Sequence, residues 1–417
     1  MESHTFDKSM AWSSQLRTLL TQTLTGSTAG KHTRTVQRMA VLSTAAGLCL
    51  YLLGHAVVNG FQWEIPQRMG RFWGHLQIRH LKTAEQEYRE PLPWDQDKIG
   101  RITKTPGVQR VSPVVLVPAL AQTANGMEGV LLKGIETIPL PFNAGKLVQG
   151  RLPQWPKPQA QEILLPQVLA SKLRLRVGDK VAVYFMQEPV RMRSLRVVGI
   201  FDMPMQSELG RPVALVPSGI LHKILGWGPD RCSHLEIELQ NFEQMNTVRT
   251  TIEKTLPLQQ ECLTLEDQMP SLFEWLRFFD TNRLVLLILL ATVGGVNLLS
   301  ALLILLLERQ NSLGILQSLG LRAAPLATVV WQLGMRMVLK GWLYGNLALG
   351  ILMFSQWKFN WFTLDPGSYY LDAVPLRLGL WEWLWVNITA LIATTIVLYT
   401  AATWIARRSI DRNIKFS

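Results

Sequence analysis

Few residues in this sequence have the types and spacing that catalysis requires. The nearest match to a phosphate-binding loop, from Gly26 to Lys31, is one residue shorter than the G-x-x-x-x-G-K-[ST] pattern, and a histidine follows it. The seven histidines stand at no metal-ligand spacing, and the three cysteines form no C-x-x-C pair. The H-E-x-x-H and G-x-S-x-G motifs are absent as well. We therefore predict a non-catalytic chain that binds no metal and no cofactor of its own.

The segment most suited to a function is short and runs from Glu308 to Leu321, with the sequence ERQNSLGILQSLGL. It lies between two long apolar runs. Its two glycines permit tight turns, and three large aliphatic side chains give it an apolar face that suits a groove in a partner protein. The alternative is a plain connecting turn.

Four apolar segments position this turn. Hydrophobic residues make up 48% of the 417 residues and charged residues only 17%, against about 25% in globular proteins. At about 1.5 Å per residue, each segment is long enough to cross a bilayer core of about 30 Å. We predict transmembrane helices at residues 39–60, 281–307, 326–357 and 380–406.

The third of these segments contains two charges, Arg336 and Lys340. Their long side chains reach the cytoplasmic boundary most easily if the membrane-buried part begins after them, at Gly341. Gly341, Gly345 and Gly350 have a spacing that lets two helix backbones approach closely. The alternative is that these glycines are incidental, because glycine is common in membrane helices.

Basic residues set the orientation, because they concentrate in the short flanks on the cytoplasmic side. Both termini are predicted in the cytoplasm, as residues 1–38 and 407–417, together with the loop 308–325. Residues 61–280 and the loop 358–379 then lie outside. The net charge of +12 would suit nucleic acid, but its place beside the apolar runs favours an anionic membrane face, so no nucleic-acid partner is expected.

The cytoplasmic lead-in has one apolar helical face, from Trp12 to Leu24. This pattern is typical of a helix that lies in the membrane interface. A poorly ordered tail is the alternative.

The outer region mixes helix and strand signals, so we predict a large α+β domain between the first and second membrane helices. Asn125-Gly126 marks a hairpin between two valine-rich strands, and Gln167 to Leu173 has the pattern of a short helix. Pro91 to Pro93 has the composition of a linker or an exposed turn. Cys232 and Cys262 share this domain, and a disulfide or two free thiols are both open. An amphipathic stretch, Pro270 to Asp280, leads without a break into the second span.

The Glu308–Leu321 turn resembles the E-[RK]-x-x-E-[IV]-[GA]-I-L-[RK]-x-[LQ]-G signature of FtsX-like ABC permeases, the family of MacB and of the lipoprotein-releasing LolC and LolE. Four spans with a large domain after the first also match that family. Val58 to Glu64 resembles the M-N-G-F-x-x-E of LolC and LolE, and Leu169 to Asp179 resembles their L-A-x-x-L-x-x-x-x-G-D. Val130 to Ile135 and Tyr369 to Pro375 are similar to further motifs of the same branch.

The resemblance implies a non-catalytic permease subunit of the bacterial inner membrane. Such a subunit works with a second permease, in a homo- or heterodimer, and with a separate LolD-like ABC ATPase that uses ATP. The turn acts as a coupling helix that docks on the ATPase, and a lipoprotein is passed from the lipid bilayer to a periplasmic carrier. The coupling residues that this implies are Glu308, Arg309, Gly314, Ile315, Leu316, Leu319 and Gly320. The substrate path that this implies comprises Asn59, Gly60, Phe61, Phe278 and Phe279.

Several departures separate the chain from the family pattern. Ser312, Leu313 and Gln317 replace an acidic, a β-branched and a basic position of the signature. The loop Gln187 to Ser194 is shorter than the carrier-docking hook of LolC, and is more similar to LolE. Two other functions therefore stay open: a MacB- or FtsX-like mechanotransmission permease that exports other substrates or regulates an outer enzyme, and a membrane scaffold without transport.

Overall fold

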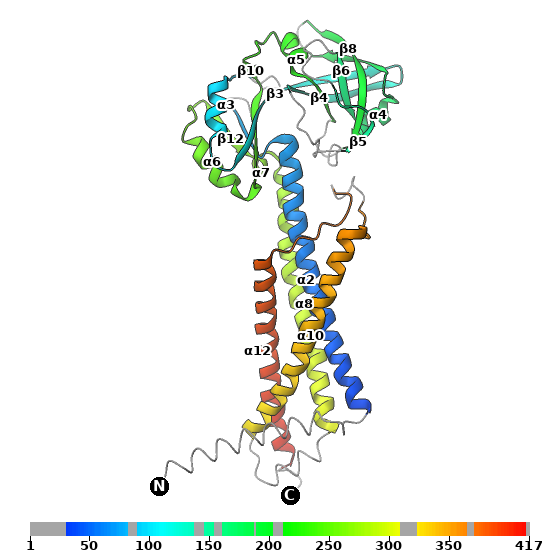
Figure 1. Cartoon of the computed structure of the whole chain (residues 1–417), viewed down its shortest axis with the longest axis vertical. Helices are drawn as coiled ribbons and strands as arrows, with labels where there is room; N and C mark the ends of the chain where they lie inside the picture. Colours follow the sequence, from blue (N-terminus) through cyan, green and yellow to red (C-terminus); the bar gives the residue numbers. More distant parts are fainter. Residues whose placement is uncertain are drawn as a thin grey trace. The chain divides into compact units, whose positions relative to one another are not determined.

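The computed structural model describes residues 31–81, 90–136, 146–153, 161–186, 189–202, 212–308, 323–364 and 371–413 (Figure 1). The chain divides into two compact units. The first, here called the helix bundle, comprises Met1–Gly60, Arg277–Trp361 and Pro375–Ser417. The second, here called the outer unit, comprises Phe61–Leu276 and Phe362–Val374.

Four long helices supply the bundle: α2 (Lys31–Trp73), α8 (Pro270–Glu308), α10 (Ala323–Phe359) and α12 (Leu380–Asn413). Among the described residues, three stretches are long and apolar enough to cross a membrane: Arg34–Trp73, Gly334–Phe359 and Leu380–Thr400. The other predicted span, 281–307, falls on α8, where several side chains lie outside the described part. A fourth span therefore stays a prediction.

Small residues and polar ties hold the bundle helices together. A Cβ added at Gly341 would lie 2.7 Å from Thr44 Cβ, and one at Gly345 would lie 2.8 Å from the Ala45 carbonyl oxygen, so α10 and α2 touch along this line. Gly350 was predicted to pack against another helix in the same way, but an added Cβ there meets nothing within 4 Å. That glycine faces open space, because it stands off the i, i+4 line of the other two.

Side-chain hydrogen bonds join α10 to α12. Asn346 Nδ2 donates to Asn387 Oδ1 at 3.0 Å, and Trp383 Nε1 donates to Asn346 Oδ1 at 2.7 Å. Amide and indole groups of this kind replace the hydrophobic drive that lipid does not provide between helices. Cys49 is buried beside Leu52 in an apolar cluster, as a small hydrophobic residue would be.

The outer unit is built on a ten-stranded sheet in the order β12-β1-β11-β3-β4-β9-β6-β8-β5, with β7 pairing with β3 and β8. β3 joins the two halves of the sheet, one made of β12, β1 and β11 and the other of β4 to β9. Its first part pairs with β11, and its second part pairs with β4 and β7. The sheet strands are β1 (Leu76–His80), β3 (Val108–Thr123), β4 (Gly126–Ile135), β5 (Lys146–Gly150), β6 (Glu162–Pro166), β7 (Lys180–Phe185), β8 (Arg191–Asp202), β9 (Val213–Pro217), β11 (His234–Leu239) and β12 (Gln260–Thr264).

Short helices cover this sheet, and the main core lies under α4 and α5. That core includes Val117, Leu132, Phe185 and Ala214, all at most 2% exposed. Leu169 and Leu173 of α4 and Leu221 of α5 complete it. The helices of the outer unit are α3 (Gln96–Thr103), α4 (Gln167–Leu173), α5 (Ser218–Leu225), the 3-10 helix η1 (Phe242–Gln244), α6 (Met245–Glu253) and α7 (Leu265–Gln268).

Most elements expected in the outer region are confirmed. β3 and β4 form the predicted hairpin around Asn125-Gly126, with Gly126 at φ 153°, and α8 runs unbroken from Pro270. The prediction of a linker or an exposed turn at 91–93 is wrong for Leu92. Leu92 is fully buried because it forms β2 (Leu92–Pro93), which pairs with β10 (Arg231–Cys232).

The cysteines of the outer unit are settled in favour of thiols. Cys232 and Cys262 are both free and buried. Burial raises the pKa of each to about 12, so neither is a reactive thiolate. The lead-in Trp12 to Leu24 lies outside the described residues.

Candidate functional site

The predicted coupling segment begins where α8 ends, at Glu308. α10 begins at Ala323, so Arg309 and the remaining coupling residues up to Gly320 lie outside the described part of the chain. The structure describes the two helices that flank this segment, α8 before it and α10 after it. α8 is one helix of 39 residues, from Pro270 to Glu308, so the predicted segment follows directly on a helix end.

The start of α8 is fixed by a short helix with complete capping. Thr264 Oγ1 accepts from Asp267 N at 3.1 Å, and Asp267 Oδ2 accepts from Thr264 N at 2.9 Å, which is a capping box for α7. Leu265 N also donates to the His75 carbonyl oxygen at 2.9 Å. The lead-in to α8 is therefore tied to His75, the second residue after the end of α2.

Asn59, a predicted substrate-path residue, is the centre of a polar cluster in the bundle. Its Nδ2 lies 2.9 Å from Glu382 Oε2 of α12 and 3.1 Å from Nε2 of His55, one turn earlier on α2. Its Oδ1 accepts from Arg283 Nη1 of α8 at 3.3 Å, and Arg283 pairs with Asp280 at 3.1 Å. Three helices thus meet at one amide.

The sequence carried a signal for part of this cluster. His55 is the only ionisable side chain in the first apolar run, and Glu382 stands at the edge of the last. Ionisable residues inside membrane segments mark functional positions or partners. Arg283 was missed because no sequence rule pairs it with a helix more than 200 residues away.

The remaining substrate-path residues lie in different settings. An added Cβ at Gly60 would run into the Pro375 carbonyl oxygen, and Arg377 N donates to the Ala56 carbonyl at 3.0 Å, so a chain segment lies directly on α2 here. Phe61 is 5% exposed and packs edge-on against Trp275 with ring centroids 6.4 Å apart, so it supports structure. Phe278 is 61% exposed on α8, and Phe279 is half-buried.

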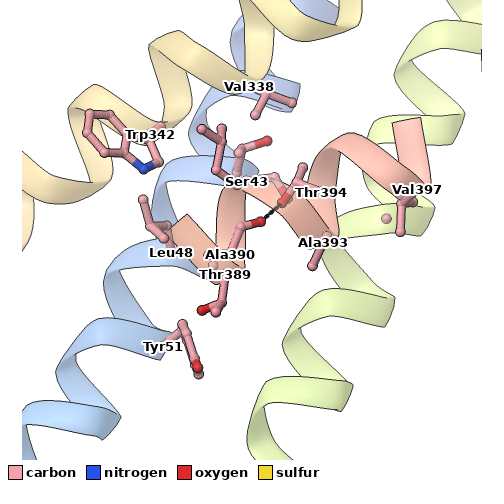
Figure 2. A pocket seen from close by; sticks show the side chains of 15 residues that line it. Ser43, Leu48, Tyr51, Val338, Trp342, Thr389, Ala390, Ala393, Thr394 and Val397 are labelled. Carbon is pink, nitrogen blue, oxygen red and sulfur yellow. Dashed lines mark hydrogen bonds between the residues drawn. The ribbon is translucent and has the colours of Figure 1, made fainter. Parts of the chain in front are cut away.

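A cavity of about 200 Å³ lies among the four bundle helices (Figure 2). Apolar side chains such as Leu48 and Val338 line most of it. The hydroxyls of Thr44, Thr389 and Thr394 that line it donate to carbonyls of their own helices at 2.7 to 3.0 Å. Among the described residues that line this cavity, none is charged.

A buried ionic cluster in the outer unit was not foreseen. Lys133 of β4, 3% exposed, donates from Nζ to both carboxylate oxygens of Glu236 on β11, at 2.7 and 2.8 Å. It also donates to the carbonyl oxygen of Phe72, in the last turn of α2. His234 Nε2 lies 3.2 Å from Glu236 Oε1.

Electrostatics keeps this cluster together. Burial lowers the pKa of Lys133, and the Glu236 carboxylate opposes that effect. For Glu236, burial alone would raise the pKa, but Lys133 and His234 outweigh burial and lower it. A carboxylate held in its charged form keeps a hydrogen-bonded partner for the buried ammonium group.

His75, just after α2, is fully buried. Its Nδ1 accepts from Leu239 N at 3.0 Å, and its ring fills the space beside Gly70, where an added Cβ would collide with it. Burial, with a smaller contribution from Arg71, lowers the pKa of His75 from 6.5 to about 4. The side chain is therefore neutral at pH 7. Among the described residues, no group of His, Cys, Asp and Glu could hold a metal ion.

No protein-family model matches the chain. It is 22% identical over 381 residues to the lipoprotein-releasing system transmembrane protein LolE of Haemophilus influenzae, covering 85% of this chain and 88% of that one. It is 26% identical over 394 residues to LolC of Xylella fastidiosa, covering 89% and 92%. A solved periplasmic region of MacB from Actinobacillus actinomycetemcomitans covers 48% of this chain and 92% of its own, at 15% identity and a TM-score of 0.33.

Helices long and apolar enough to cross a membrane, a large α+β unit and the similarity to transmembrane proteins of lipoprotein-releasing systems support the class of a membrane permease with a large folded domain. Within that class, the chain is a relative of the LolC and LolE transmembrane proteins over most of its length. This finding confirms the resemblance indicated by the sequence motifs. Permeases of this kind are non-catalytic and work with ABC ATPases.

Proposed function

We propose that the chain is the permease subunit of an ABC-type complex that extracts lipoproteins from the bacterial inner membrane. The observation that carries this proposal is the similarity to LolE and LolC, which extends over 85% and 89% of the chain. The element order supports it, because a large unit follows one long helix and three more helices follow that unit.

The proposed arrangement has four membrane helices, with both termini in the cytoplasm. The turn 308–321 docks on a LolD-like ATPase, which binds and hydrolyses the ATP. A second permease, identical or different, completes the membrane part. The lipoprotein leaves the lipid bilayer along Asn59, Gly60 and Phe278, and a periplasmic carrier receives it.

Two helices suit the relay of force. α2 and α8 each include residues of both units, and an α-helix is stiff along its axis. α2 also contains Pro66, which lacks the backbone N–H for one helix hydrogen bond and makes α2 the less rigid of the two. Gln62 Nε2 of α2 donates to the Leu276 carbonyl of α8 at 3.3 Å, and Phe61 packs on Trp275, so the two helices are joined within the outer unit. A stroke on α8 would therefore be shared with α2.

Reconstitution of the chain with its ATPase in lipid vesicles tests the proposal. Ile315→Asp and Leu316→Asp place a charge on the apolar face of the turn, so the ATPase should be lost on purification and lipoprotein release should stop. Leu258→Asp is the matched control, because Leu258 is 97% exposed in the outer unit. An ATPase that stays bound to the Ile315→Asp protein would overturn the coupling role.

A mechanotransmission permease for another substrate is the second candidate. The connection between β7 and β8 supports it, because only five residues separate Phe185 from Arg191, which leaves a short loop for a carrier to grip. A photo-crosslinker at Asn59 and at Phe278 separates the two functions. Lipoprotein adducts at either position favour release, and active complexes without any such adduct favour the second candidate.

A further inference from the structure

The last turn of α2 ends in a geometry that only glycine permits. Gly74 has φ 77°, and an added Cβ would lie 2.9 Å from the Leu76 carbonyl oxygen and 3.1 Å from Ile237 N. The final carbonyls of a helix have no donor within the helix and carry the negative end of its dipole. A cation placed there is both a hydrogen-bond donor and a favourable charge.

Lys133 is that cation. Its Nζ donates to the Phe72 carbonyl and lies 4.6 Å from the centroid of the Phe72 ring and 5.1 Å from that of Trp73. Both rings therefore surround the ammonium group with their π faces. The helix end is held at its backbone and at two side chains by one residue of β4.

Glu236 holds Lys133 from the other side. It receives two of the lysine hydrogen bonds, and it stands on β11, which pairs with β1 directly after α2. β11 and β4 flank β3, the strand that belongs to both halves of the sheet. The cluster thus joins the end of α2 to both halves at once.

A buried ion pair such as Lys133–Glu236 contributes little net stability. Replacement of a buried pair by apolar side chains of similar size is often neutral or stabilising, because desolvation offsets the attraction. Apolar contacts, however, permit sliding, whereas hydrogen bonds to one carbonyl fix a position. The contacts of Lys133 therefore favour a positioning role.

We propose that Lys133, held by Glu236, is the positioning residue that locks the end of α2 to the sheet, so that movement of the helix turns the sheet as one body. The proposal rests on the proposed function, in which α2 and α8 relay the stroke of the ATPase. Lys133 is 3% exposed, so it is not accessible to a lipoprotein or a nucleotide. Its loss should uncouple the two activities.

The test compares Lys133→Met with wild type in the complete complex with ATPase, in lipid vesicles. Methionine keeps the apolar stem and removes the ammonium group. We expect an ATPase rate within about twofold of wild type, at least a tenfold fall in lipoproteins released per ATP hydrolysed, and at least tenfold faster hydrogen exchange over residues 70–78. A purely structural loss would lower both activities in proportion.

Arg110→Met is the matched control. Arg110 of β3 pairs with Glu238 of β11 at 2.7 Å, so this pair shares only β11 with the Lys133–Glu236 pair. Arg110 is near enough to lower the pKa of Lys133, but the Phe72 carbonyl receives its hydrogen bond from Lys133 and not from Arg110. This variant should keep the wild-type ratio of release to hydrolysis and the wild-type exchange at 70–78. If Lys133→Met fails to fold, Lys133→Met with Glu236→Met removes both buried charges, and the same uncoupling is expected of it.

Two results would overturn the proposal: wild-type exchange at residues 70–78 in the Lys133 variant, or an unchanged number of lipoproteins released per ATP. A wild-type complex that hydrolyses ATP and releases nothing overturns the proposed function instead. Hydrogen exchange in the variant then still decides whether Lys133 holds the helix end.

Discussion

The outer unit and the helix bundle bury their side chains in opposite ways. In the outer unit, large residues such as Phe185 and Phe201 are fully buried, and apolar surface is turned inward. In the bundle, Leu347, Phe354 and Trp357 are 59% to 77% exposed, because lipid surrounds a membrane helix. The outer unit is thus stabilised by removal of apolar surface from water, and the bundle by close backbone approach and polar ties.

Among the variants that test this difference, the largest loss of stability is expected from a substitution in the core of the outer unit. Phe185→Ala should destabilise it by about 3–5 kcal/mol, because the substitution removes buried apolar area and leaves a cavity. Phe354→Ala in the bundle should cost less than about 0.5 kcal/mol, because that ring faces outward. Chemical unfolding of the full chain in lipid discs measures both, and equal losses would contradict the contrast.

A second test uses pH. His75 is neutral in the folded state and its pKa falls from 6.5 to about 4, so the unfolded state binds more protons between these values. The stabilisation is fully present above pH 6.5 and is lost as pH falls toward 4, by about 3 kcal/mol at about 1.4 kcal/mol per pH unit.

His75→Asn isolates that contribution, because asparagine can still accept from Leu239 N and does not titrate. The unfolding free energy of the outer unit should therefore fall between pH 6.5 and pH 4 by more in the wild type than in His75→Asn. Parallel pH curves for the two proteins would show that His75 is not the source. Melting of the bundle should be unaffected by the substitution.

A third test addresses close approach in the bundle. Gly345→Ala should destabilise the packing of α10 on α2 by about 1–3 kcal/mol, because the new Cβ would lie 2.8 Å from a backbone oxygen that cannot move aside. Gly350→Ala is the same change in open space and should be neutral, or stabilising by up to about 1 kcal/mol. Titration with a denaturing detergent reports helix dissociation, and equal midpoints for the two variants would argue against the close contact.

The smallest effect is expected at the polar cluster of the bundle. Asn59→Ala removes the hydrogen bonds to Glu382 and Arg283, and ties of this kind contribute about 1 kcal/mol in membranes. Asn282→Ala, at an exposed position of α8, is the control. The same detergent titration should distinguish the two variants. A loss above about 3 kcal/mol for Asn59→Ala would contradict the expected small contribution of these hydrogen bonds.

Local signals were sufficient for much of the outer unit. The helix Gln167–Leu173 and the hairpin at Asn125-Gly126 follow from periodicity and turn chemistry within a few residues, and both are confirmed. The two-residue strand at Leu92 was missed because its partner, Cys232, lies 140 residues away and its prolines are typical of turns. Short pairings of distant segments leave no periodic pattern.

The site was foreseen less well than the fold. Lys133 stands in an apolar strand, and nothing near it in the sequence indicates that Glu236 or the carbonyl of Phe72 will meet it. Motif similarity drew attention to Asn59, but two of its three partners, Glu382 and Arg283, come from other helices. Long-range placement, and not residue type, creates both clusters.

The stretch of α2 between Phe61 and Phe72 has a fixed phase. Phe61 meets Trp275, and eleven residues later the Phe72 carbonyl meets Lys133, which is about three helical turns at 3.6 residues each. One inserted residue between them would rotate one contact by about 100° relative to the other and advance it by about 1.5 Å. The two contacts could not then form together. A whole added turn would restore the rotation but shift one contact by about 5.4 Å, so the length of this stretch is fixed as well as its phase.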